Sequence, residues 1–271
     1  MFFRAILALF AVLLLSSPAL GVCLETEKLL AGEKILYDVH ISRYGKVGES
    51  EISIRIVDHL RGLYLAEFFS KPYGLASVFS DVSRDVFSSK LKLEKGKLVS
   101  QGFYNKTHYG SAKFSKTEFS FEDQAKVFVK KKYDGDKIVY KKVLPAGNVS
   151  REDLLSVFYN LRHHFYGVLP DGMTLKIKTI PFDLGDKSDN EESAIEIKVA
   201  IDEETNLFRK ADKRGDSSKH LLFFKIPPGL FEHGVIAGRV WSNECLLPEF
   251  LFLKNATRAG DDITIRLRTK K

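Results

Sequence analysis

The residues best suited to bind a ligand lie in two short segments of the chain. Tyr159 and Arg162 belong to the first segment, and Arg239 and Trp241 belong to the second. Arginine binds anionic groups through a planar fork of N–H donors, while tyrosine and tryptophan each combine a ring with one polar atom. We expect these four residues to form a ligand-binding site, and we assign no residue a catalytic role.

Known catalytic and cofactor motifs are absent from the sequence. It has no Gly-x-Ser-x-Gly elbow, no His-Glu-x-x-His pair, no phosphate loop and no Gly-x-Gly-x-x-Gly turn. His163 and His164 are adjacent, so on a helix their side chains point about 100° apart and cannot share a metal ion without other ligands. The acidic residues show no paired spacing. We expect a protein that is not an enzyme and has no cofactor or metal.

One clear amphipathic helix is predicted, over residues 150–167. Ser150 is the expected N-cap, and Gly167 followed by Pro170 is expected to end the helix. A step of about 100° per residue gathers the apolar side chains on one stripe, and Arg162 falls inside that arc. An unpaired buried charge is strongly unfavourable. Arg162 therefore either ties the helix to the sheet through an oxygen partner or faces a ligand.

Short strand patterns fill most of the remaining chain. Residues 51–56 alternate between polar and apolar, which is typical of an antiparallel strand with one solvated face. Lys95-Gly96 and Asp134-Gly135 predict hairpin turns. We therefore predict a mainly β protein, a curved antiparallel sheet or open β-barrel partly wrapped around the one central helix. Residues 205–219 are charge-rich and are expected to form an exposed loop or a hairpin tip.

The N-terminal residues have the pattern of a secretory signal. Arg4 precedes an apolar run of about 11 residues, too short to span a bilayer, and small residues follow. We expect residues 1–21 to be a signal peptide and residues 22–271 to be a single exported, periplasmic domain. Val22 argues against lipid attachment at Cys23, because a small residue normally precedes an acylated cysteine.

Two cysteines, Cys23 and Cys245, lie near the two ends of the mature chain. In an oxidising compartment a disulfide between them would close a very large loop and restrict the unfolded chain. The alternative is a free or acylated Cys23 and a buried Cys245.

The chain is basic and rich in phenylalanine. Its formal net charge is +7, and it contains 21 Phe and 10 Tyr. Lysines at positions 130–132 and 141–142 fall on strands expected to be neighbours, so they would either attract an anionic lipid or polysaccharide or simply keep a strand face solvated. The phenylalanines would either fill the core or line a cavity for an acyl chain. Export makes nucleic acid an unsuitable partner.

Four segments together resemble the exported bacterial proteins known as domain of unknown function 3108 (DUF3108). The resemblance covers essentially the whole mature chain and implies a compartment and a curved antiparallel sheet around a helix, but no reaction. Leu154 stands where the family usually has a proline, which leaves helix initiation to Ser150. The segments are residues 32–37 with the glycine turn and strand that follow, residues 153–162, residues 239–242, and the strand opened by Leu247-Pro248.

Two functions remain open. The first is an exported carrier or sensor that binds a lipid or another amphipathic ligand between the sheet and the helix, with Arg162 and Trp241 near the cavity. The second is a structural or assembly factor of the cell envelope that binds a protein or polysaccharide through its surface. After signal removal, no apolar run is long enough to suggest an integral membrane protein.

Overall fold

The structure, a computed structural model, describes most of the chain beyond the expected signal peptide. Within the described ranges, no helix has the length and apolar character needed to cross a bilayer. The predicted signal peptide and both cysteines, Cys23 and Cys245, lie outside the described residues. The described residues are 32–74, 82–110, 113–122, 126–180, 193–213, 218–226, 236–244, 246–254 and 260–268.

The described residues form one antiparallel sheet of 14 strands, which confirms the prediction of a mainly β, open-sheet fold. The sheet order is β8-β7-β6-β5-β4-β3-β2-β1-β14-β13-β12-β11-β10-β9. All neighbouring strands are therefore consecutive along the chain except β1 and β14, the first and last described strands, which pair with each other. The strands are β1 (Lys34–Ile41), β2 (Gly45–Asp58), β3 (Leu63–Pro72), β4 (Val82–Glu94), β5 (Lys97–Tyr109), β6 (Lys113–Glu122), β7 (Val127–Asp134), β8 (Lys137–Pro145), β9 (Thr174–Lys178), β10 (Ala194–Val199), β11 (His220–Ile226), β12 (Ile236–Ser242), β13 (Pro248–Leu253) and β14 (Ile263–Leu267).

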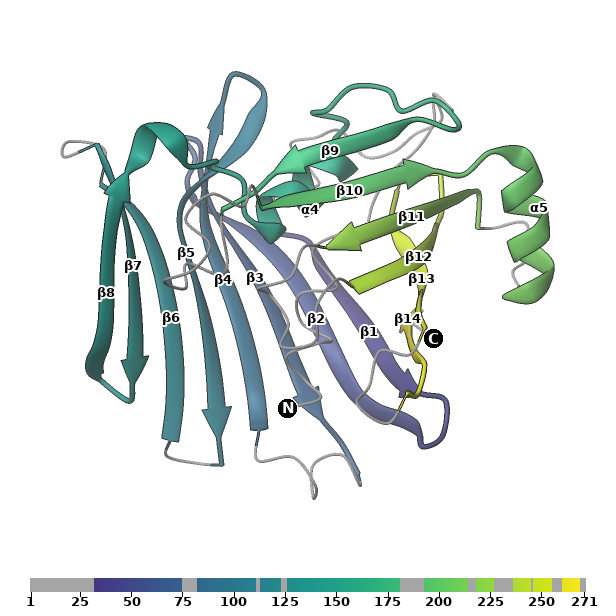
Figure 1. Ribbon diagram of the computed structural model, residues 1–271, viewed down its shortest axis with the longest axis horizontal. Helices are drawn as coiled ribbons and strands as arrows, with labels where there is room; N and C mark the ends of the chain where they lie inside the picture. Colours follow the sequence, from purple (N-terminus) through teal and green to yellow (C-terminus); the bar gives the residue numbers. More distant parts are fainter. Residues whose placement is uncertain are drawn as a thin grey trace.

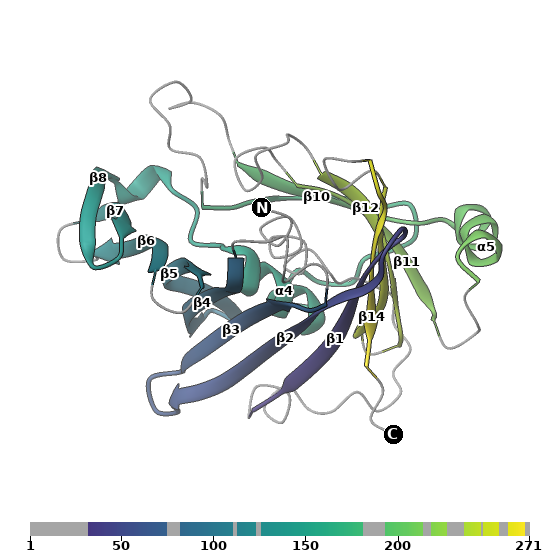
Figure 2. The same cartoon turned by 90° about the horizontal axis from the view of Figure 1, so that it is seen from below.

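The sheet curls around helix α4 (Leu154–Arg162) without closing, and β8 and β9 are its two edges (Figures 1 and 2). Tight turns make the long hairpins possible. Between β4 and β5, Lys95 and Gly96 both have positive φ, 51° and 78°, the two-residue turn geometry that matches the twist of a hairpin. The predicted turn at Asp134-Gly135 is also present, and Gly135 has a φ of 57°.

A ladder of phenylalanine rings crosses the concave face of β4, β5, β6 and β7. Consecutive ring centroids lie 5.3, 5.7, 5.7 and 5.0 Å apart, and all five rings are buried. Contacts at this spacing stabilise an aromatic cluster beyond the area it buries. The ladder belongs to the main core that also contains α4. Its members, in order, are Phe87, Phe103, Phe119, Phe128 and Phe121.

Helix α4 starts at a different residue from the one predicted. Asp153 is the N-cap, because its carboxylate accepts from two backbone N–H groups of the first turn at 2.9 Å and its own N–H donates to Ser156 Oγ. The prediction of Ser150 as the cap is therefore wrong. Ile180 donates its N–H to the carbonyl of Glu152 at 2.8 Å, so the chain before the cap is held against the segment that follows β9.

Helix α4 is buried on all sides, since all nine of its residues are buried. Two polar contacts fix it to neighbouring strands. The carboxylate of the N-cap Asp153 accepts from Ser89 Oγ of β4. Asn160 pairs with the backbone of Leu98 in β5, accepting from its N–H at 2.7 Å and donating to its carbonyl at 2.8 Å. These contacts, from Asp153 and Asn160, make the helix a fixed part of the core.

A second helix, α5 (Asp202–Ala211), lies where an exposed loop was predicted, so that prediction is wrong over residues 205–211. None of its residues is buried, and it projects from the outside of the sheet (Figure 1). Three acidic residues in its first turn and two basic residues in its last turn complement the helix dipole. Glu204 accepts from the N–H of Ile201 at 3.2 Å, which satisfies one of the free donors at the helix start.

Candidate functional site

Arg162, the ligand-binding candidate inside the apolar arc, is paired with a carboxylate. Its guanidinium makes two hydrogen bonds to Glu33, which lies just before β1, and Nη2 is 2.5 Å from Oε1. The Arg162 side chain is 4% exposed and that of Glu33 is 16% exposed. A two-pronged contact of this kind is strong and directional. The ion pair ties the helix to the segment that leads into β1. This is the structural alternative for Arg162, in which an oxygen partner links the helix to the sheet.

Two tyrosines and a histidine surround this ion pair. Tyr37 and Tyr159 are buried, and burial raises the pKa of both phenols. Burial lowers the pKa of His163 to about 3, and the nearby positive charge of Arg162 adds to this effect. All three side chains are therefore neutral near pH 7 and are poorly suited to exchange protons there. Among the described residues, Tyr159 Oη and His163 Nε2 make no hydrogen bond.

His163 should make the protein less stable in acid. Its folded pKa lies below the unfolded value of about 6.5, so the unfolded chain binds more protons between pH 6.5 and pH 3. Stability is therefore lost as the pH falls below 6.5, by about 2 kcal/mol at pH 5 from this group. His163→Phe keeps a ring between Tyr159 and Phe165. The free energy of unfolding in urea should therefore fall by about 2 kcal/mol less between pH 7.5 and pH 5 in this variant than in the wild type. If the free energy of unfolding depended on pH in the same way in both proteins, a lowered pKa of His163 would be contradicted.

Arg239 and Trp241, the other two ligand-binding candidates, lie on the opposite face of the sheet. Side chains alternate along β12, so Val240 joins the main core with α4 while Trp241 joins a separate outer cluster. Arg239 Nε and Trp241 Nε1 donate to the same oxygen of Asp212, at 2.7 and 2.9 Å. The prediction that these residues and Arg162 share one site between sheet and helix is therefore wrong.

This outer cluster attaches α5 to the sheet. Asp212 directly follows the helix, and Phe208 of the helix packs edge-on against Phe223 of β11, with 5.4 Å between ring centroids. The guanidinium of Arg239 lies over the ring of Phe252 at 4.0 Å. The sequence analysis did not identify Asp212, because no motif or spacing near Asp212 relates it to Trp241, which is 29 residues away.

Asp212→Ala should destabilise the protein by about 2 kcal/mol, because it leaves the Trp241 N–H and the Arg239 guanidinium without their shared acceptor. Urea unfolding followed by Trp241 fluorescence measures this loss directly. Asp202→Ala, at the exposed start of α5, is the matched control and should change stability by less than about 1 kcal/mol. Equal effects of the two substitutions would contradict a special role for Asp212.

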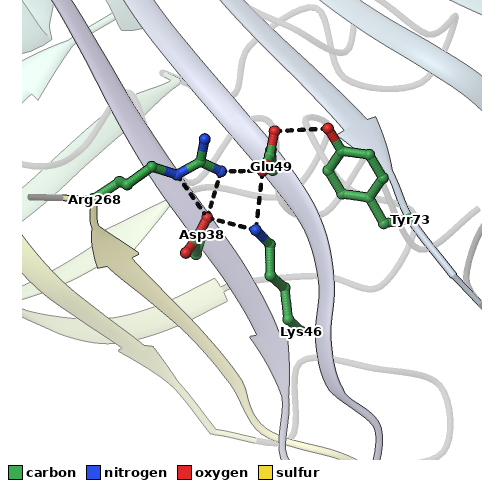
Figure 3. A network of polar contacts seen from close by, with 5 residues as sticks. All are labelled: Asp38, Lys46, Glu49, Tyr73 and Arg268. Atoms are coloured by element: carbon green, nitrogen blue, oxygen red, sulfur yellow. Dashed lines mark hydrogen bonds and ion pairs between the residues drawn. The ribbon is translucent and has the colours of Figure 1, made fainter. Parts of the chain in front are cut away.

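A network of five charged and polar residues joins β1, β2, the end of β3 and the end of β14 (Figure 3). Arg268 and Lys46 both contact Asp38, at 2.5 and 3.0 Å, and both contact Glu49, which also accepts from Tyr73 Oη at 2.6 Å. Burial acts to raise the pKa of Asp38 and Glu49, but hydrogen bonds outweigh it and both values are lowered.

Both carboxylates of this network are therefore ionised and matched by cations, which suits a structural clamp where β1 pairs with β14. Neither is prepared to donate a proton near neutral pH. Across the described ranges, no three His, Cys, Asp or Glu side chains are grouped so that they could hold a metal ion.

The lysines at positions 130–132 and 141–142 lie on neighbouring strands, as the sequence predicted, but they occupy both faces of the β7–β8 hairpin and not a single face. On the concave face, Lys130 lies directly opposite Lys142, and Lys132 lies two residues further along β7. On the outer face, Lys131 lies opposite Lys141. Lys130 is only 2% exposed, and its ammonium group lies 5.4 Å from the ring centre of Phe119 in the phenylalanine ladder. Basic and aromatic side chains thus adjoin on the concave face.

No family model and no curated protein matches the sequence, so the resemblance to DUF3108 is not confirmed by either comparison. Among solved structures, the chain is similar to a beta-barrel-like protein of domain of unknown function DUF1849 from Brucella abortus. The sequence identity is 13% and the TM-score is 0.46, with 89% of this chain and 97% of that chain covered. This likeness assigns no function.

Proposed function

We propose that the protein is an exported, non-enzymatic binding protein that holds a lipid or another amphipathic ligand on the concave face of β4–β8. The observation that carries the proposal is the position of Lys130 in β7, whose ammonium group lies 5.4 Å from the ring centre of Phe119 in the phenylalanine ladder and which is directly opposite Lys142 of β8. An amphipathic ligand needs an apolar surface directly beside a polar one. Export rests on the signal pattern of residues 1–21.

The proposed surface differs from the sheet–helix interface expected from the sequence. Helix α4 is fully buried, and Asp153, Asn160 and Arg162 each have a partner in or beside the sheet. A ligand between helix and sheet would have to displace these contacts. The lysine-bearing half of the concave face lies nearer the free edge at β8. We also propose that the chain is related to the exported DUF3108 proteins, through the segments that resemble them.

The test is native mass spectrometry, with lipid extraction, of the mature chain purified from its own envelope fraction. A stoichiometric adduct that contains an acyl chain is the expected result. A mass that matches residues 22–271 alone, together with an empty lipid extract, would argue against a carrier.

A second function, an envelope assembly factor that binds another protein, is favoured by the edge strand β8. Ile138, Val139 and Val143 are 49%, 57% and 49% exposed on this strand. An edge strand with exposed apolar side chains offers backbone groups and pockets to an added strand. Crosslinking in the envelope that depends on β8, without any lipid adduct, would support this function in place of the first.

A further inference from the structure

We propose that the turns between β2 and β3 and between β4 and β5 dock the protein on an anionic lipid membrane. The docking surface, here called the tip patch, consists of the exposed side chains of Val57, Leu60 and Leu93. These side chains would enter the interface of the bilayer, while basic side chains beside them contact lipid phosphates. This inference goes beyond the proposed function and does not depend on it, because docking requires no lipid on the concave face.

The tip patch brings together three apolar side chains that are open to solvent. Leu60 is 98% exposed, Val57 is 56% exposed and Leu93 is 39% exposed. Val57 and Leu60 lie at the end of β2 and in the turn that follows it, and Leu93 is the last residue but one of β4. A single exposed leucine is ordinary on a protein surface, whereas neighbouring exposed apolar side chains indicate contact with a partner.

Hydrogen bonds hold the two turns side by side. Leu93 donates its N–H to the carbonyl of Gly62 at 2.9 Å, and a Cβ atom at Gly62 would lie 3.5 Å from the Cβ atom of Leu93. Within the first turn, Asp58 Oδ1 accepts from the N–H of Arg61 at 3.1 Å. The turn between β4 and β5 protrudes at the upper end of the sheet (Figure 1). The two turns therefore present the tip patch as one surface.

Basic side chains flank the tip patch. Residues 58–62 and 92–97 contain four Lys or Arg residues and two acidic residues, which gives a net charge of +2. The Arg61 side chain is 79% exposed, although it lies 3.5 Å from Asp58, and Lys95 is exposed in the second turn. Long basic side chains keep their charge in water while their stems lie along an apolar layer, and each one near an anionic membrane adds attraction. The charge of the two turns thus favours a membrane that contains negative lipids.

The shape of the tip patch favours a lipid bilayer over a protein. Because Leu60 is 98% exposed at its turn, it contacts almost nothing in its own chain, and a protein partner would need a matching pocket for it. A bilayer interface accepts apolar side chains without a preformed pocket. Strand β8 differs, because as an edge of the sheet it offers backbone groups to a partner strand.

Cosedimentation of the mature chain with lipid vesicles tests the proposal. One set of vesicles contains equal parts of phosphatidylglycerol and phosphatidylcholine, and the other contains phosphatidylcholine alone. V57S/L60S removes two apolar side chains of the tip patch, and its matched control, V139S/V143S, removes two exposed apolar side chains of β8. R61Q/K95Q removes two charges beside the tip patch, and its matched control, K137Q/K141Q, removes two exposed charges of β8. Thermal unfolding verifies that all four variants are folded.

We expect the wild type to bind the anionic vesicles, and V57S/L60S to bind them more weakly by about tenfold or more. R61Q/K95Q should lose about tenfold on the anionic vesicles and little on phosphatidylcholine alone. Each control should change binding by less than about threefold, because β8 is four strands away from β4. Added salt should weaken binding of the wild type to the anionic vesicles.

Leu60→Trp tests insertion into the bilayer directly. Tryptophan is favoured at membrane interfaces, so this variant should bind at least as tightly as the wild type. The wild type contains one tryptophan, the buried Trp241, and supplies the fluorescence background. On anionic vesicles, the added fluorescence should shift to shorter wavelength and be quenched by lipids with brominated acyl chains. Unchanged emission in the presence of bound vesicles would show that the tip patch stays in water and would overturn the proposal.

Four other results would also overturn the inference. They are failure of the wild type to bind either set of vesicles, and equal losses in V57S/L60S and V139S/V143S. The third is equal binding of the wild type to both sets with no effect of R61Q/K95Q, which would remove the role of anionic lipid. The fourth is a crosslink to an envelope protein that V57S/L60S abolishes while vesicle binding is unchanged, which would assign the tip patch to a protein. The lipid adduct in native mass spectrometry tests the proposed function separately from all of these results.

Discussion

Glu33→Ala is expected to lower the free energy of unfolding by about 3–5 kcal/mol, because it leaves the guanidinium of Arg162 buried without its carboxylate. The Arg162 side chain is 4% exposed and lies under the curled sheet, so water cannot readily replace the lost partner. Urea unfolding with linear extrapolation measures the change. The more exposed pair Lys34–Glu51, which joins β1 to β2, is the matched control, and Glu51→Ala should change stability by less than about 1 kcal/mol.

A double-mutant cycle separates the ion pair from other effects of the substitution. Arg162→Met leaves Glu33 without its partner, and Glu33→Leu leaves Arg162 without its partner, whereas the two substitutions together remove both charges. The double variant should be more stable than the sum of the single losses predicts, by more than about 1 kcal/mol. Simple additivity would show that Arg162 and Glu33 do not stabilise the helix through each other.

Asp153→Ala is expected to destabilise the protein by about 2–4 kcal/mol, since it removes the cap of α4 and its contact with Ser89 in one step. Burial raises the pKa of Asp153. Asp153→Asn keeps an acceptor for the first turn and buries no charge, so it should lose less than half as much.

Ser150→Ala is the matched control for the cap, because Ser150 is the cap that the sequence favoured. Its hydroxyl donates to the carbonyl of Lys178 at 2.7 Å, outside the helix, so its loss should be no more than about 1 kcal/mol. Circular dichroism during urea unfolding of the Ser150→Ala and Asp153→Ala variants compares the two positions. A larger loss at Ser150 would contradict the observed start of α4.

The sequence by itself determined the strands and their hairpins. An alternating pattern and a two-residue turn act over a few residues, so Lys95-Gly96 and the alternation in residues 51–56 were sufficient to predict β4, β5 and β2. The sequence also showed that Arg162 lies in an apolar arc and needs a partner. The sequence could not identify this partner as Glu33, because the two residues are 129 positions apart.

Only the tertiary structure decided the helix starts and the grouping of the candidate residues. The N-cap is Asp153 because tertiary contacts hold residues 150–152 outside the helix, through Lys178 of β9, Ser100 of β5 and Ile180 after β9. Helix α5 forms in a segment with few apolar residues to indicate a helix. Arg239 and Trp241 were separated from Arg162 because alternate side chains of β12 point to opposite faces of a curled sheet. Which face becomes the interior depends on how all 14 strands curl around α4, and that is a property of the whole chain rather than of any segment.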